Sequence, residues 1–326
     1  MEQIALACRP HWRERLIFSL AAAVAVGVAS WNWSAVPEPA ASDFSQLWAA
    51  AGYWTEGQNP YDVVGPDRPF QWRYPLLYPL PGVITALPFV SLPLGWANCL
   101  FSAIGAGALV WTLTAFTLKN PQLLGLISIP FVITVQLAQW SPLLIAAAFQ
   151  PWLGWLLACK PSTAAMLFSA FPRWQALAGS SAFITLSLVL MPSWPTRWLD
   201  ALGTATHMVP GVLLPGGVLV LLALLKWRRA EARLLLSMAC IPHTLSLYEC
   251  VPLFLVVRRS WEGLLLVACA VIAYACWQSS DRPTFDAHQA WAARWSLWML
   301  YLPCTALVLT RPNVWSVDSR VGAPDR

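Results

Sequence analysis

Charged residues are scarce in this chain of 326 residues. Asp, Glu, Lys and Arg make up 11% of it and hydrophobic residues 58%, whereas an ordinary soluble domain carries about 25% charged residues. A surface that faces water needs charges to remain dissolved. The composition therefore excludes most soluble folds and predicts that lipid covers most of the surface.

Several motifs are also missing. The eight cysteines form no Cys-x-x-Cys pair and most lie within apolar runs, so neither a zinc site nor a disulfide framework is expected. Phosphate-loop, Rossmann, nucleophile-elbow and zinc-protease spacings are absent as well, which disfavours a nucleotide-sugar donor. The net charge of +5 comes from small basic clusters between apolar runs, which indicates membrane topology and no nucleic-acid partner.

Long apolar runs are what the sequence does have. They cover about 16–36, 76–92, 94–118, 123–137, 143–159, 162–171, 176–191, 212–225, 234–257, 261–277 and 291–310. A helix needs about 20 residues to cross the hydrocarbon layer, so the run 162–171 is too short to cross. The pattern predicts an all-α polytopic membrane protein with roughly nine to eleven transmembrane helices, one membrane domain over 1–312, and a disordered tail over 313–326.

Basic residues predict the orientation. Arg9, Arg13 and Arg15 precede the first apolar run, and the positive-inside rule places them in the cytoplasm and the segment 37–74 on the exoplasmic side. Many of the 21 tryptophans lie near segment ends, among them Trp140 and Trp315. They are expected to anchor the chain at the membrane interfaces.

Basic clusters flank both ends of the run 234–257. Arg228 and Arg229 precede it, and Arg258 and Arg259 follow it. If both clusters face the same side, the segment enters the membrane and returns as two half-helices. Such irregular backbone is tolerated at depth only where it is buried or lines a wet cavity, so His243 and Glu249 are expected beside a cavity.

A short amphipathic helix is predicted in the first exoplasmic loop. Apolar residues at 44, 47, 48, 51 and 54 follow helical spacing, and Gly57 ends the pattern, which is typical of a helix lying on a membrane. Asp43 lies at its start. The local pattern favours Asp43 as the N-cap, with Gln46 completing a capping box.

The loop and the helix after it also resemble a known family. The order Asp43-Phe44, an aromatic-rich helix, Gly57-Gln58-Asn59-Pro60-Tyr61-Asp62 and then Phe70-Gln71-Trp72-Arg73-Tyr74-Pro75 is similar to GT-C glycosyltransferases. More narrowly it resembles polyprenyl-phosphate-mannose-dependent alpha-1,2-mannosyltransferases, which are glycosyltransferase family 87 or domain of unknown function 2029. Weaker similarities follow at Ala138-Gln139-Trp140, where the family tends to have Gly-Gln-x-Asn, at Lys160-Pro161, and at Pro242-His243-Thr244 with Tyr248-Glu249.

The resemblance implies a function. A hexose, commonly mannose in this family, would move with inversion and without a metal or cofactor from a polyprenyl-phosphate donor to a lipid or glycan acceptor. Asp43 matches the family's catalytic aspartate and would act as general base. Lys160, His243 and Arg73 would hold the donor phosphate. The remaining pocket candidates are Phe44, Tyr61, Tyr74, Gln139, Tyr248 and Glu249. The implied location is a bacterial inner membrane, with membrane lipids around the chain and the site facing the periplasm.

Alternatives stay open on the sequence alone. Lys160 is equally well explained as a snorkelling lysine at a helix end, His243 as a structural residue, and Arg73 as a contact to headgroups. A transporter or flippase for a lipid-linked or small amphipathic substrate would also need broken helices and buried charges, although the two related halves of many transporters are not found. A family member that binds a lipid-linked sugar without turnover is the third possibility.

Overall fold

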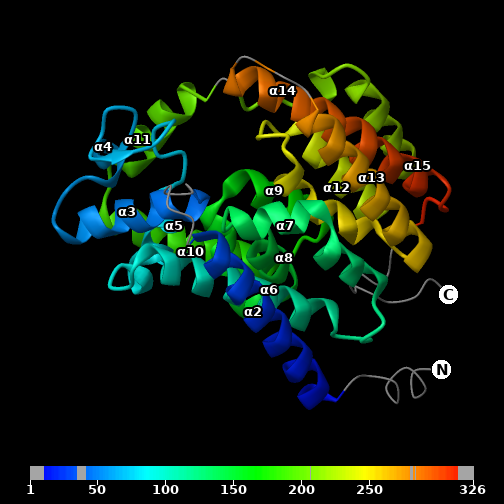
Figure 1. Ribbon diagram of the computed structural model, residues 1–326, viewed down its shortest axis with the longest axis horizontal. Coiled ribbons are helices and arrows are strands. Elements are labelled where there is room, and N and C mark those ends of the chain that lie inside the picture. Colours follow the sequence, from blue (N-terminus) through cyan, green and yellow to red (C-terminus); the bar gives the residue numbers. More distant parts are fainter. Residues whose placement is uncertain (1–10, 35–41, 206, 280–281, 283, 315–326) are drawn as a thin grey trace.

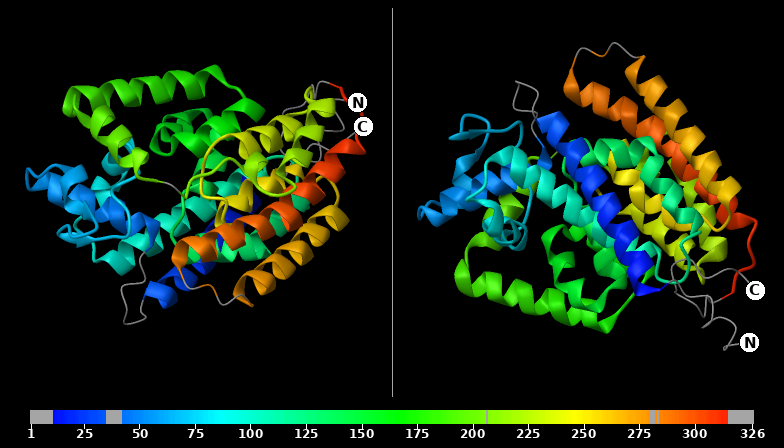
Figure 2. Two further views of the ribbon diagram at one scale, coloured as in Figure 1. Left: turned by 90° about the horizontal axis from the view of Figure 1, so that it is seen from above. Right: turned by 60° about the horizontal axis from the view of Figure 1, so that its bottom comes forward.

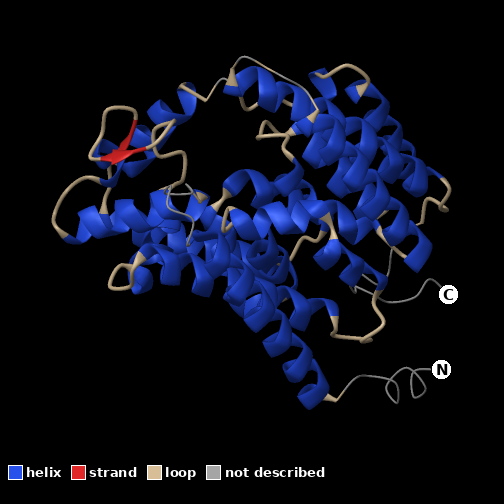
Figure 3. Cartoon of the chain, in the orientation of Figure 1, coloured by secondary structure: helices blue, strands red, loops and turns tan. Residues whose placement is uncertain are grey.

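The computed structural model describes residues 11–34, 42–205, 207–279, 282 and 284–314, and it is built almost entirely of helices (Figure 3). The all-α prediction is confirmed. The α-helices are α2 (Trp12–Ser34), α3 (Asp43–Thr55), α4 (Pro60–Val63), α5 (Leu80–Ala86), α6 (Leu94–Leu113), α7 (Ile129–Gln136), α8 (Ser141–Phe149), α9 (Pro161–Ala170), α10 (Trp174–Leu190), α11 (Trp194–Gly203), α12 (Ala230–Cys240), α13 (Ser260–Gln278), α14 (Phe285–Ser296) and α15 (Leu302–Leu309).

Shorter or tighter segments connect these helices. The 3-10 segments are η1 (Leu87–Phe89), η2 (Pro121–Ile127), η3 (Pro151–Cys159), η4 (Gly211–Leu213), η5 (Gly217–Lys226) and η6 (Leu247–Val256), and η7 (Leu297–Tyr301) is a π-helical turn that joins α14 to α15. Two short parallel strands, β1 (Val64–Gly65) and β2 (Phe70–Gln71), pair within the loop after α4. The tail residues 315–326, predicted to be disordered, and residues 37–41 of the predicted exoplasmic loop lie outside the described residues.

Four helices in the described ranges are long and apolar enough to cross a membrane: α2, α6, α13 and the continuous helix Asp286–Leu309. The bent pairs α7–α8 and α10–α11 raise the number to six if each pair forms one span. This is fewer than the nine to eleven crossings that the apolar runs predict. Runs such as 76–92, 212–225 and 234–257 fold as shorter apolar helices, because hydropathy alone does not show where a run bends or tightens.

The outer faces of these helices are apolar and uncovered. Large hydrophobic side chains are exposed along α2, α10, η5 and α13, including Leu20, Val24, Val189, Leu225 and Leu264. A water-soluble surface seldom carries apolar patches of this extent. The exposed faces and the spanning helices together give the chain the properties of an integral membrane protein.

The segment 234–257 turns back as predicted. α12 runs in, residues 241–246 form the turn, and η6 returns. The basic residues that flank the segment meet at one end of it. There Glu231 forms ion pairs with Arg229 at 3.2 Å, Arg258 at 2.8 Å and Arg311 at 3.1 Å. Glu262 also binds Arg311, at 2.9 Å. This buried cluster fixes both ends of the returning segment at the same level of the molecule.

The predicted amphipathic helix is α3, and Gly57 follows it with a φ of 82° that suits glycine. The expectation that its apolar face lies on the membrane is wrong. That face packs on α5 and α6, where the Phe44 ring stacks on Phe101 with ring centroids 4.1 Å apart. Protein covers the apolar stripe, because the helix has aromatic and small residues that fit between the two neighbouring helices.

The helices form two groups with a central layer between them. α3, α4 and α11 lie on one side, α12, α13 and α15 lie on the other, and α7, α8 and α9 lie between (Figure 1). The views in Figure 2 show α13 running beside α14 and α15, with α10 on the opposite side of the molecule. Trp140, expected at an interface, is fully buried in the central layer against Phe101. Trp315 lies outside the described residues.

Candidate functional site

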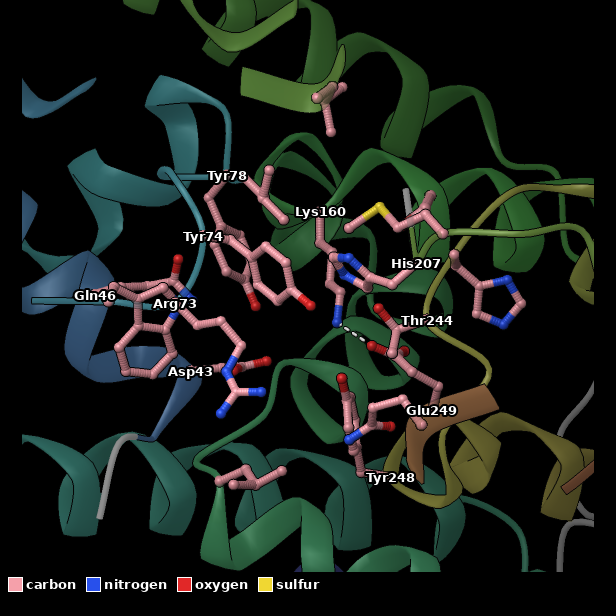
Figure 4. Close-up of a pocket in the computed structure, with 18 of the residues that line it drawn as sticks. Asp43, Gln46, Arg73, Tyr74, Tyr78, Lys160, His207, Thr244, Tyr248 and Glu249 are labelled. Atoms are coloured by element: carbon pink, nitrogen blue, oxygen red, sulfur yellow. Dashed lines mark hydrogen bonds and ion pairs between the residues drawn. The ribbon is translucent and has the colours of Figure 1, made fainter. Parts of the chain in front are cut away.

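A cavity of about 1090 Å³ lies between the two groups of helices. Its wall is formed by the start of α3, the loop after β2, the end of α7, the start of α9, α11, the turn after α12, and the ends of α13 and α14 that face it. Of the predicted site residues, it brings together Asp43, Arg73, Tyr74, Lys160, His243, Tyr248 and Glu249. All of these side chains except His243 are labelled around the cavity in Figure 4.

Asp43 is the first residue of α3, but it is not the helix cap. The N-cap is Ser42, whose hydroxyl oxygen accepts from the Ser45 N–H at 3.1 Å. The predicted capping role of Asp43 is therefore wrong, as is that of Gln46 as its partner. Because serine and aspartate cap equally well, the pattern Ser-Asp leaves two possible starts, and the contacts of Asp43 with α7 select the serine.

Asp43 is held by the break between α7 and α8. Its backbone N–H donates to the Leu137 carbonyl at 2.9 Å, and its carboxylate accepts a hydrogen bond from the side-chain amide of Gln139. The two helices meet at 107°, and Ala138 takes a φ of 46° at the corner. This left-handed turn exposes the Leu137 carbonyl and points Gln139 at Asp43.

Lys160 lies between the end of η3 and the first residue of α9, where the chain is extended. Its ammonium forms an ion pair with Glu249 and donates to the Gln139 side-chain oxygen at 3.2 Å. The side chains of Lys160 and Glu249 are only 14% and 6% exposed. The snorkelling alternative is wrong for this structure, because the ammonium points into the interior cavity and is neutralised there.

These contacts form one polar chain, Asp43–Gln139–Lys160–Glu249, in the cavity wall. It holds two carboxylates and one ammonium. Burial raises the pKa of Asp43, and this effect outweighs the opposing influence of Lys160 and Gln139. A carboxylate whose pKa is raised is a stronger base than an ordinary aspartate.

His243 lines the cavity, but protein groups occupy both ring nitrogens. Nδ1 lies 2.9 Å from the Ile241 carbonyl and Nε2 lies 3.3 Å from the Tyr301 hydroxyl. In the neutral ring, Nδ1 donates and Nε2 accepts. This arrangement fixes the turn between α12 and η6, so the structural alternative for His243 accounts for its contacts. Arg73 is exposed at the cavity wall (Figure 4).

Three other pocket candidates do not line the cavity. Phe44 is part of the aromatic packing between α3 and α6, and Tyr61 is buried with its hydroxyl donating to the Tyr78 carbonyl at 3.2 Å. Both face the core because they belong to the buried sides of α3 and α4. Gln139 lies just behind the wall, where it connects Asp43 to Lys160.

Other residues that line the cavity were not among the predicted site residues, among them Gln46, Tyr78, His207 and Thr244 (Figure 4). His207 stacks on Tyr74 with ring centroids 4.2 Å apart. The Tyr74 hydroxyl donates to Asp286 at 2.9 Å, and burial together with the neighbouring carboxylate raises its pKa to about 12. In the sequence, His207 is marked only as a histidine within a polar loop. The residues that His207 contacts lie far away in the chain, so the sequence does not show them together.

The fold and cavity define a helical membrane protein with a buried ionic site. Within the described ranges, no three His, Cys, Asp or Glu side chains gather in a way that could hold a metal ion. Comparison with family models, curated proteins and solved structures gives no match to this chain.

Proposed function

We propose that this chain is a membrane glycosyltransferase that moves a hexose from a polyprenyl-phosphate donor to a hydroxyl of a lipid or glycan acceptor. The observation that carries the proposal is the position of Asp43, whose carboxylate lies in the cavity wall and is connected through Gln139 to the ammonium of Lys160. A base and a cation on one cavity wall are what an inverting transfer from a lipid phosphate requires.

The chemistry assigns one role to each group. Asp43 accepts the proton of the acceptor hydroxyl as that oxygen attacks the anomeric carbon from the face opposite the phosphate. The bond between the sugar and the phosphate oxygen breaks, and the electron pair stays on the lipid phosphate. Lys160 stabilises the charge that develops there, with Arg73 as a second cation at the cavity wall.

Two further observations support the proposal. The cavity volume, about 1090 Å³, is slightly above the range of ordinary ligand pockets, about 300 to 1000 Å³, and accommodates a sugar phosphate beside an acceptor. Ala138 has a φ of 46°, a conformation that favours glycine, and glycine is the residue that the resembled family tends to have there. The proposed orientation places this cavity on the exoplasmic side of a bacterial inner membrane.

The decisive experiment is a transfer assay with the purified protein. Radiolabelled polyprenyl-phosphate mannose and polyprenyl-phosphate glucose are each incubated with native membrane extract, and labelled lipid and glycan products are separated. We expect one donor to be consumed and one labelled product to form. Binding of a donor without any product, in extracts from several bacterial sources, would favour the non-catalytic binder.

A transporter or flippase of a lipid-linked substrate is the second candidate. Both α7–α8 and α10–α11 are broken, with bends of 107° and 102°. The α7–α8 break lies beside the buried ion pair of Lys160, which Gln139 contacts, and broken helices beside buried charges are common in transporters. Reconstituted vesicles separate the two functions. Movement of a fluorescent prenyl phosphate sugar between leaflets, with its sugar bond intact, would support transport and contradict transfer.

A further inference from the structure

Glu249 has no role in the transfer described above, although it is the closest charged partner of Lys160. It lies on η6, 5% exposed, and its carboxylate forms an ion pair with the Lys160 ammonium in the cavity wall. Lys160 is also bound to Gln139. A lysine meant only to attract a phosphate would be a stronger anion site without a buried carboxylate beside it.

The charge of the ligand changes during the proposed reaction. The donor is a phosphodiester, which carries one negative charge. The product is a phosphomonoester, which carries up to two negative charges near neutral pH, while the acceptor proton moves to Asp43. A lysine alone would therefore hold the product more tightly than the donor, and product release would become slow.

We propose that Glu249 is a specificity-determining residue that makes the Lys160 site select phosphodiesters over phosphomonoesters. This inference rests on the proposed function, since it takes the ligand to be a lipid-linked phosphate. The Glu249 carboxylate offsets part of the positive charge of Lys160. The site therefore still attracts a phosphodiester, which has one negative charge, but repels the second negative charge of a phosphomonoester. Asp43, on the other side of Gln139, adds to this repulsion when it is ionised.

The test uses two prenyl phosphates that cannot be consumed. One is a short-chain prenyl monophosphate and the other is its methyl ester, a diester of nearly the same size. Their affinities for the purified protein are measured by calorimetry in detergent. Inorganic phosphate forms a third arm, which separates recognition of the phosphate group from partitioning of the prenyl chain.

Replacement of the carboxylate by an amide should change one affinity selectively. In Glu249→Gln we expect the monoester to bind on the order of ten- to hundredfold more tightly, as removal of one nearby charge in a protein site predicts, and the diester to change by a smaller factor. Asp67→Asn is the matched control, because Asp67 lines the same cavity at a left-handed position that asparagine tolerates. It should alter both affinities by less than about threefold.

The outcomes separate the two proposals. Equal changes for monoester and diester in Glu249→Gln overturn the selection by Glu249 and leave the transferase proposal standing. Failure of the wild type to bind either prenyl phosphate overturns the phosphate site and therefore both. The wild type gives an independent measurement if the variant does not fold: a tenfold preference for the monoester over the diester in the native protein contradicts the role of Glu249 by itself.

Discussion

Asp43→Asn separates the chemistry of Asp43 from its structural contacts. The amide retains the size of the side chain and can still accept a hydrogen bond from Gln139, but it cannot accept the acceptor's proton. Loss of a general base typically lowers the rate about a hundredfold to ten-thousandfold, which corresponds to about 2.7 to 5.5 kcal/mol of transition-state free energy. We expect sugar transfer to fall by that factor.

Stability should respond in the opposite direction. Ser42 caps α3, so the substitution removes no cap. Burial raises the pKa of Asp43 in the folded protein, which means that protonation favours the folded state. The wild type therefore loses stability as the pH rises from the unfolded pKa, about 3.9, through the higher folded value. Relative to the wild type, Asp43→Asn should be at least as stable at pH 7, and this advantage should disappear below about pH 4.

The assays are initial rates of transfer and thermal unfolding in detergent across this pH range. In the wild type, transfer should decline as the pH falls through the raised pKa of Asp43, because the protonated acid is no base. Asp62→Asn is the control for activity, since Asp62 belongs to the same loop but forms only a 3.7 Å ion pair with Arg197 at the surface. Ser42→Ala is the control for the cap and should cost about 1 kcal/mol of stability. Wild-type transfer by Asp43→Asn would refute the assignment of Asp43 as the base.

Four further outcomes are expected. Lys160→Met leaves Glu249 buried without its cation and should lower the free energy of unfolding by about 3 to 5 kcal/mol. Adding Glu249→Gln should restore most of the thermal stability and none of the transfer. A double variant that is no more stable than Lys160→Met would contradict the ion pair. Ala138→Val should destabilise by about 1 to 3 kcal/mol because a β-branched residue is strained at this φ, whereas Ala138→Gly should unfold at the wild-type temperature or above it; equal unfolding temperatures for both variants would count against the left-handed corner. Glu231→Gln should cost about 3 to 5 kcal/mol, because it leaves three clustered arginines without their shared carboxylate, and the exposed Glu56→Gln should stay within about 0.5 kcal/mol of the wild type. In a background lacking the exposed Cys240, a cysteine at position 56 should react with an impermeant reagent from outside and one at position 228 only after the inner face is opened; the reverse labelling pattern would contradict the proposed orientation.

Local sequence patterns predicted much of the helical fold. The start of α3 near Asp43, the short α9, and the return of 234–257 all follow from the spacing of apolar residues and from basic clusters at their ends. The number of helices long enough to cross was overestimated, because the bends at Ala138 and between α10 and α11 depend on backbone conformation that hydropathy does not record.

The sequence by itself determined that the chain belongs in lipid and which charged residues lie in apolar segments. Low charge content required lipid, and Lys160 and Glu249 stood out because a charge within an apolar segment is costly unless it has a partner. Only the tertiary structure decided which partners they have. The chain Asp43–Gln139–Lys160–Glu249 joins residues that are 96, 21 and 89 positions apart, and hydrogen bonds over such separations depend on how the helices pack. The same packing made Ser42 the cap of α3, because the contacts of Asp43 with Leu137 and Gln139 turned its side chain into the cavity wall.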